Sequence, residues 1–181
     1  MGSGGRAEFT GILLSRGAVH NGAEAFVRHD CTRCHNGPAF SDGKFHNIGI
    51  PSTDPGRIAG IPQLLADIFN GAGIFSEDRD AGAVKLAMAA TETGTNGAFK
   101  TASLRGVGQR NFFGHASHQE TLRGFIEDIY RGRRGRNDRT ATVGTLDPLM
   151  NGVAVPDDEL DDLVAFLRTL DCPGDVTGTG G

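Results

Sequence analysis

The chain has 181 residues, which is enough for one domain with a hydrophobic core. Its formal net charge of −4 gives no reason to expect a nucleic-acid partner, and it contains no run of about 18 apolar residues that could span a membrane. Tryptophan is absent and glycine is abundant, with 28 residues, so we expect a loop-rich protein whose core is completed by a further apolar body.

The two ends of the chain are rich in glycine and polar residues. The start is not typical of a secretory signal peptide, because its apolar stretch, Gly11–Leu14, is too short. We therefore expect residues 1–18 to be a tag or a disordered lead and residues 174–181 to be a flexible tail. The folded domain is expected over residues 19–173.

The first predicted helix is short and leads into a cysteine motif. Ala23, Phe26 and Val27 follow helical spacing and end just before the run Cys31-Thr32-Arg33-Cys34-His35. A C-x-x-C-H run is typical of c-type haem attachment. The two thiols bond to the haem vinyl groups, and the imidazole of His35 then ligates the iron in its neutral form, with its other ring nitrogen donating to a backbone carbonyl.

Two other interpretations of the cysteine pair are weaker. A thioredoxin-like redox pair is expected in a βαβ unit, of which the chain gives no sign. A zinc site needs a second pair of cysteine or histidine ligands at short spacing, and none follows. The third cysteine, Cys172, is left without a role.

The rest of the chain alternates between loops and helices. Residues 36–60 and 91–97 have loop composition. Helices are expected over residues 61–69, 81–90, 119–131 and 158–170, the last two with clear apolar stripes. The stripe residues are Leu122, Phe125, Ile126 and Ile129 in the helix over residues 119–131, and Leu160, Leu163, Val164, Leu167 and Leu170 in the helix over residues 158–170. Because no strand pattern appears, the predicted fold class is all-α, a cytochrome c-like haem domain with long loops.

Several blocks, in order, give the chain a family resemblance from about Gly22 to Leu170. They are Cys31–Phe45 continuing through Pro51, Asp54–Arg57, Gly97–Val107, Leu146–Met150 and Asp162–Leu170. With these blocks the chain resembles the C-terminal haem domain of bacterial di-haem cytochrome c peroxidases and their MauG-type relatives. The family pattern differs at Ala102, where it has proline, and at residues 113–117, where it has Phe-His-Asp-Gly without an apparent inserted residue. Family members also carry two haem domains, whereas this chain has one haem motif, so the resemblance implies half of an enzyme or a free-standing domain.

The resemblance implies roles for residues outside the haem motif. Phe40 is expected to pack on the porphyrin edge, Lys100 and Arg105 to pair with haem propionates, and His115 to line the pocket. The sixth iron ligand in the family is a methionine or a tyrosine, which makes Tyr130 the first candidate. Met150 is the second candidate.

Two functions remain open at this point. One is peroxide chemistry at haem iron, or electron transfer to it, as part of a peroxidase-type oxidoreductase that receives electrons from a donor protein. The alternative is a mono-haem electron carrier without turnover. The resemblance further implies a periplasmic or otherwise exported protein and allows a second haem domain or chain as a partner. It also allows calcium, for which the chain shows no ligand loop.

Overall fold

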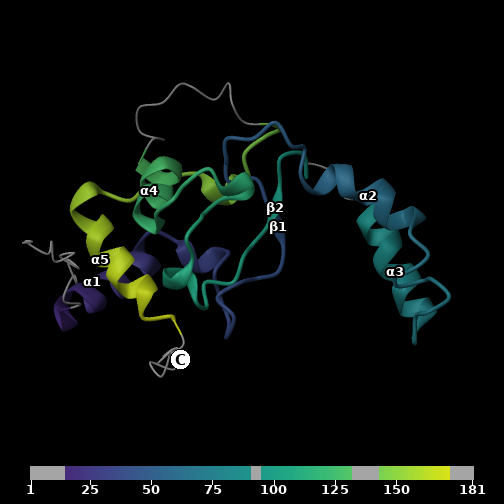
Figure 1. Cartoon of the computed structure of the whole chain (residues 1–181), viewed down its shortest axis with the longest axis horizontal. Helices are drawn as coiled ribbons and strands as arrows, with labels where there is room; N and C mark the ends of the chain where they lie inside the picture. The colour runs from purple at the N-terminus through teal and green to yellow at the C-terminus, as the bar shows by residue number, and fades with distance from the viewer. Residues whose placement is uncertain (1–14, 91–94, 132–142, 172–181) are drawn as a thin grey trace, which may run out of the picture.

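The computed structural model describes residues 15–90, 95–131 and 143–171, and these residues are mostly helical (Figure 1). Its helices and strands follow in chain order. They are α1 (Arg16–Arg28), the 3₁₀ turn η1 (Cys31–Arg33), β1 (Phe45–His46), α2 (Arg57–Ala66), α3 (Arg79–Ala90), β2 (Phe99–Lys100), the 3₁₀ turns η2 (Val107–Gln109) and η3 (His115–Ser117), α4 (Leu122–Ile126), the π-helical turn η4 (Glu127–Arg131), the 3₁₀ turn η6 (Pro148–Met150) and α5 (Asp157–Arg168). In the described residues, no helix is long and apolar enough to cross a membrane.

The first and last helices pack directly against each other. Their backbones approach closely at Gly22, where an added Cβ would lie 1.9 Å from the carbonyl oxygen of Asp162. The amide of Asn21 donates to the carboxylate of Asp162 at 3.0 Å in the same region. A glycine in the middle of α1 therefore sets how near the two helices come.

The hydrophobic core lies where α1, α4 and α5 meet. The predicted stripe of α5 is buried throughout, and Leu160 is fully inaccessible to solvent. The predicted stripe before Arg131 is also buried at Leu122, Ile126 and Ile129. Both stripes are thus confirmed as core faces.

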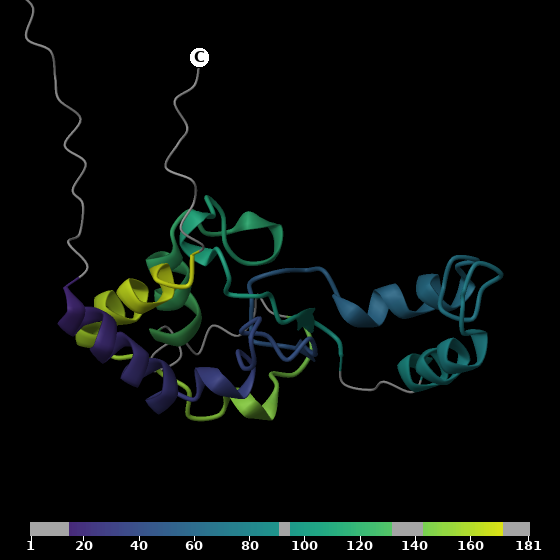
Figure 2. The same cartoon turned by 90° about the horizontal axis from the view of Figure 1, so that it is seen from below.

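A two-residue ladder joins distant parts of the chain. β1 and β2 are antiparallel, with Phe45 opposite Lys100 and His46 opposite Phe99. Strands this short give no alternating pattern, so the sequence did not predict them. A bridge between Gly56 and Ala98 extends the contact and closes the base of the segment that carries α2 and α3. Figures 1 and 2 both show these two helices projecting beyond the strands, away from α1, α4 and α5.

Several predicted boundaries move because side chains cap the helices. The first helix begins at Arg16, inside the segment expected to be a lead, because the Ser15 hydroxyl accepts from the Ala18 amide. The helix expected over residues 119–131 begins at Leu122, after the hydroxyl of Thr121 accepts from Gly124, and ends as a π-helical turn. The helix expected over residues 61–69 ends at Ala66, since the Asn70 side chain donates to the carbonyls of its last turn. Residues 1–14 and 172–181, including Cys172, lie outside the described residues.

Candidate functional site

A cavity of about 480 Å³ opens between the core helices and β2. Phe26 of α1, Leu122 and Ile126 of α4, and Leu163 and Leu167 of α5 form much of its wall. Its size falls within the roughly 300–1,000 Å³ of ordinary cofactor sites. The apolar wall belongs to the same cluster that forms the core, so the cavity extends from the surface into the core.

The haem motif lies on the wall of this cavity. Asp30, in the left-handed region at φ 59°, turns the chain out of α1, and η1 follows at once. Within this turn the amide of His35 donates to the carbonyl of Cys31 at 2.9 Å. Cys31, Cys34 and His35 all line the cavity as a result.

The ring of His35 has the surroundings expected of a neutral metal ligand. Its Nδ1 lies 2.9 Å from the carbonyl oxygen of Phe40, an acceptor, so Nδ1 carries the proton and donates. Burial lowers the pKa of His35, although the bond to Phe40 opposes this effect. The neutral tautomer protonated at Nδ1 leaves Nε2 with the lone pair that a metal needs.

The two thiols are held in their neutral form. Burial raises the pKa of Cys31 to about 11, and burial followed by the charge of Asp42 raises the pKa of Cys34. Neither sulfur is in a disulfide among the described residues. A thiol–disulfide exchange pair needs a cysteine with a lowered pKa, so the raised pKa values of Cys31 and Cys34 do not favour the redox-pair interpretation.

Two residues expected to contact the cofactor lie outside the cavity wall. The Nε of Arg105 donates to the carbonyl of Pro38 at 2.9 Å, and its guanidinium lies 5.2 Å from the centre of the Phe40 ring. Phe40, at φ 48°, packs edge-on against Phe26. In this structure both residues hold the loop whose carbonyl orients His35, and the propionate contact of Arg105 and the porphyrin contact of Phe40 stay predictions.

The other predicted cofactor residues do line the cavity. Lys100 is exposed at its rim on β2, and His115 stacks on Phe99 with ring centres 4.0 Å apart. The Nε2 of His115 lies 2.8 Å from a carboxylate oxygen of Asp54. The bond from the Gly56 amide, and then this contact with His115, lower the pKa of Asp54. His115 is thus held from one side by a carboxylate and from the other by an aromatic ring.

Both candidates for a sixth ligand are also on the cavity wall. Tyr130 is half-buried in the π-helical turn η4, a type of turn often found at functional sites. Met150 is only 8 % exposed and ends the turn η6. The contacts give no order between them.

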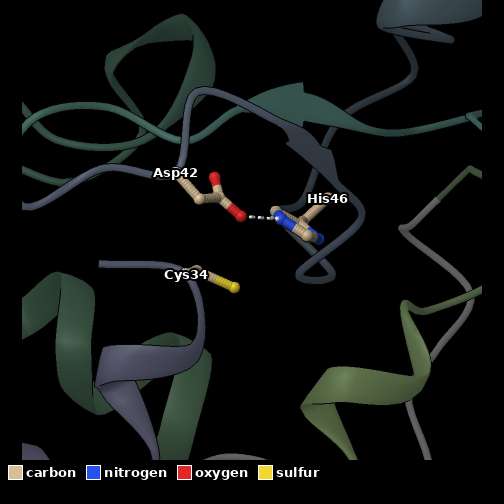
Figure 3. A group of neighbouring side chains, drawn as sticks. All are labelled: Cys34, Asp42 and His46. Atoms are coloured by element: carbon tan, nitrogen blue, oxygen red, sulfur yellow. Dashed lines mark hydrogen bonds and ion pairs between the residues drawn. The ribbon is translucent and has the colours of Figure 1, made fainter. Parts of the chain in front are cut away.

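His46, a further histidine on the wall, is already engaged at both nitrogens. Its Nδ1 lies 2.6 Å from Asp147 and its Nε2 lies 2.8 Å from Asp42. Figure 3 shows the Asp42–His46 pair across from the sulfur of Cys34, and the ligand atoms of these three lie within 4.8 Å of one another. An imidazole with a carboxylate at each nitrogen is protonated at both and has no lone pair for a metal, so this group does not favour a zinc site.

Several residues of the cavity wall were not predicted from the sequence. Ile48 and Ile50 after β1, Leu104 before η2, and Val153 and Val155 before α5 all line the cavity. Most of these residues lie inside or beside the blocks that carry the family resemblance, which was the available signal. Their loop setting gives no periodicity from which burial could be predicted.

No family model matches the chain, but the chain is similar to known proteins, of which three are described here. The methylamine utilization protein MauG of Methylophilus methylotrophus is 28 % identical over 142 residues, which is 78 % of this chain. A solved MauG-like protein associated with microbial copper homeostasis covers 85 % of this chain at 20 % identity with a TM-score of 0.55. A variant of the diheme peroxidase BthA of Burkholderia thailandensis covers 86 % at 22 % identity with a TM-score of 0.50.

The chain is shorter than each of these proteins. It spans 32 % of the MauG sequence and 46 % and 42 % of the two solved structures. The structural matches support a shared fold, and the sequence match agrees with the blocks that carry the resemblance. The relationship to the MauG and di-haem peroxidase family predicted from the sequence is confirmed.

Proposed function

We propose that this chain, a relative of MauG and the di-haem peroxidases, binds one covalent haem c and takes part in peroxide reduction at its iron. The observation that carries the proposal is the meeting of Cys31, Cys34 and His35 on the wall of one apolar cavity, with His35 oriented by the carbonyl of Phe40. When bound, the haem supplies the electron and oxygen chemistry, while the chain supplies ligands, orientation and exclusion of water.

The chain's own groups fit the chemistry of covalent attachment. Two cysteine sulfurs on one wall can form the two thioether bonds, and a neutral imidazole is the form that iron ligation requires. The exposed cation Lys100 at the rim suits a haem propionate, and Arg110, also on the wall, is a second such cation. One C-x-x-C-H run supports one haem per chain.

His115 is the group that we assign to proton transfer. Its Nε2–H donates to Asp54, which leaves Nδ1 able to accept a proton. Reduction of hydrogen peroxide to two water molecules consumes two protons and two electrons. We infer that the protons pass through a group on the cavity wall and that the electrons come from a donor protein, with a second haem domain or chain as a further partner.

A mono-haem electron carrier is the second candidate function. Met150 supports it, because a buried methionine on the cavity wall suits His/Met ligation, which raises the potential and closes the iron to peroxide. Tyr130 supports the peroxidase-type proposal, because a tyrosine ligand is typical of the MauG-type relatives that the sequence resembles.

The test of the cofactor is covalent haem retention. The full chain, exported by a bacterium that attaches c-type haem, is expected to keep one iron per chain and its haem absorbance after acid–acetone extraction. The Cys31→Ala/Cys34→Ala double variant is expected to lose that absorbance, whereas Cys172→Ala, a matched loss of a thiol outside the motif, keeps it. Covalent haem in the double variant contradicts the proposal.

The test of the reaction is the optical response of the haem-loaded protein to peroxide. A peroxidase-type site is expected to change its Soret band on addition of peroxide, with Tyr130→Phe altering the resting spectrum and Met150→Leu leaving it unchanged. The opposite pattern, no peroxide response and a resting spectrum that depends on Met150, supports the electron carrier.

The proposed cofactor also indicates the cellular compartment of the protein. Covalent haem attachment normally takes place outside the bacterial cytoplasm, so we propose a periplasmic or otherwise exported protein. Calcium stays an expectation of the resemblance, and we assign it no ligands.

A further inference from the structure

The helical pair α2 and α3 with its connecting loop, residues Arg57–Ala90, forms a projecting arm (Figures 1 and 2). The described residues expose eleven large apolar side chains, and eight of them lie on this arm. Those that are more than 60 % exposed are Ile68, Phe69, Ile74, Phe75, Val84 and Met88. The concentration of apolar surface on one element is what requires an explanation, since single exposed apolar residues are ordinary.

The tip of the arm is held in place by its own polar contacts. The Asn70 amide donates to the carbonyl of Leu64 at 3.1 Å, and Arg79 donates to the carbonyl of Ala72 at 3.1 Å. Gly71 and Gly82 let the loop backbone lie directly on α3, where an added Cβ on Gly82 would meet the Gly71 carbonyl oxygen at 1.7 Å. The contacts thus hold the loop in a conformation that leaves its apolar side chains exposed to solvent.

Two phenylalanines form the centre of this display. The rings of Phe69 and Phe75 stack at 5.0 Å with 13° between their planes, although the residues are 71 % and 65 % exposed. A rigid aromatic pair held in the open has the character of an interface anchor.

In the described residues, no further element packs over the exposed apolar side chains of the arm to form a hydrophobic core with them. Within the arm only Ile61, Gly82 and Ala89 are buried, which is little support for two helices. Six apolar side chains, each more than 60 % exposed on this one arm, present an apolar surface on the order of several hundred Å². Exposed apolar patches of that size mark protein–protein interaction sites.

The charges on the arm indicate the kind of partner. It carries three basic residues, Arg57, Arg79 and Lys85, and four acidic residues, Asp67, Glu77, Asp78 and Asp80. A nearly balanced set does not attract a strongly charged protein or an anionic membrane, but it can face a copy of itself across a two-fold axis. We propose that the arm is a homodimer interface, in which the arms of two copies of this chain pack into a four-helix unit. The proposal stands apart from the haem function, because it rests on the arm alone.

Sedimentation equilibrium of the haem-loaded full chain tests this interface. The wild type is expected to have twice the mass of the 19.0 kDa chain with its haem, and Phe69→Asp/Phe75→Asp to be monomeric. The conservative Phe69→Leu/Phe75→Leu pair is expected to keep the dimer, and so is Val27→Asp, a matched change at a 62 % exposed apolar residue on α1. The dissociation constant of the aspartate pair is expected to rise by at least about 100-fold.

A second variant separates a lost interface from a damaged tip. Val84→Glu lies on α3 and leaves the stacked rings and their loop intact, and it is expected to weaken the dimer as well. The haem absorbance of every variant is expected to equal that of the wild type, so failure of the interface and failure of the haem site give different readouts. A wild type that stays monomeric at about 100 µM overturns the proposal, because a standard interface forms well below that concentration. Dimers of undiminished stability in both the aspartate pair and Val84→Glu overturn it equally.

Discussion

At the scale of single residues, His46 connects the haem motif to the far side of the cavity. Its ring joins Asp42, seven residues after His35, to Asp147, whose own carboxylate caps the turn that ends at Met150. The Asp147 amide also donates to the carbonyl of Asn47 at 2.9 Å. One imidazole therefore fixes β1 and the η6 turn relative to each other.

The protonation of His46 predicts a pH dependence of stability. Burial lowers the pKa of His46, but the bonds to Asp147 and Asp42 outweigh burial and raise it above the ordinary value. Because the folded pKa is the higher one, the stabilisation is complete below about pH 6.5 and is lost as the pH rises through the folded pKa. We expect the melting temperature of the haem-loaded wild type to fall across that interval.

The matched variants for this measurement are His46→Gln and His20→Gln. His46→Gln is expected to melt lower than the wild type at pH 6 and to lose the decline above it. His20 is an exposed histidine paired with Glu24, so His20→Gln is expected to follow the wild-type curve. If the melting temperature of His46→Gln still falls with rising pH as in the wild type, another group causes the pH dependence.

At the scale of the elements, the contact between α1 and α5 positions the haem motif. α1 leads directly into Cys31, and α5 supplies Leu163 and Leu167 to the cavity. The carboxylate of Glu159 in α5 pairs with both Arg28 and His29, just before the motif. The contact between the two helices thus fixes the position of the backbone just before Cys31.

Gly22→Ala tests this helix contact. The new methyl group overlaps the Asp162 carbonyl, so we expect α1 and α5 to separate and the free energy of unfolding to fall by about 1–3 kcal/mol. Gly60→Ala is the control, because Gly60 lies within α2 and no atom lies within 4 Å of an added Cβ. That change is expected to stabilise by roughly 0.5–1 kcal/mol through the better helix propensity of alanine. Denaturant unfolding measures both, and equal effects of the two substitutions would contradict the close contact at Gly22.

At the scale of the whole molecule, the cavity and the core are one structure. The cluster that packs Phe26, Leu122, Ile126, Leu163 and Leu167 together also faces the cavity. Core side chains that face an unfilled cavity lack packing partners on that side. We therefore expect the stability of the fold to depend on a cofactor that fills the cavity.

Preventing haem attachment tests this dependence. The Cys31→Ala/Cys34→Ala variant, purified without haem, is expected to keep part of its helical circular dichroism but to lose a cooperative thermal transition. The haem-loaded wild type is expected to unfold cooperatively. A cooperative transition at the wild-type temperature in the haem-free variant would show that the core closes without the cofactor.

The sequence alone determined the features that depend on neighbouring residues. The C-x-x-C-H pattern occupies five consecutive positions, so Cys31–His35 is identified as a candidate haem motif without tertiary information. The helical stripes before Arg131 and Leu170 likewise follow from local periodicity, and their burial confirms them.

The tertiary structure decided everything that depends on residues far apart in the chain. His46 meets Asp147 across 101 positions and His115 meets Asp54 across 61, and no spacing rule predicts such pairs. The contacts of Arg105 with Pro38 and of Phe40 with Phe26 likewise join separate segments and could not be predicted from spacing. The exposure of the arm also depends on tertiary structure, because burial depends on which elements pack together. The sequence of α2 and α3 does not show that so many of their apolar side chains stay exposed in the described chain.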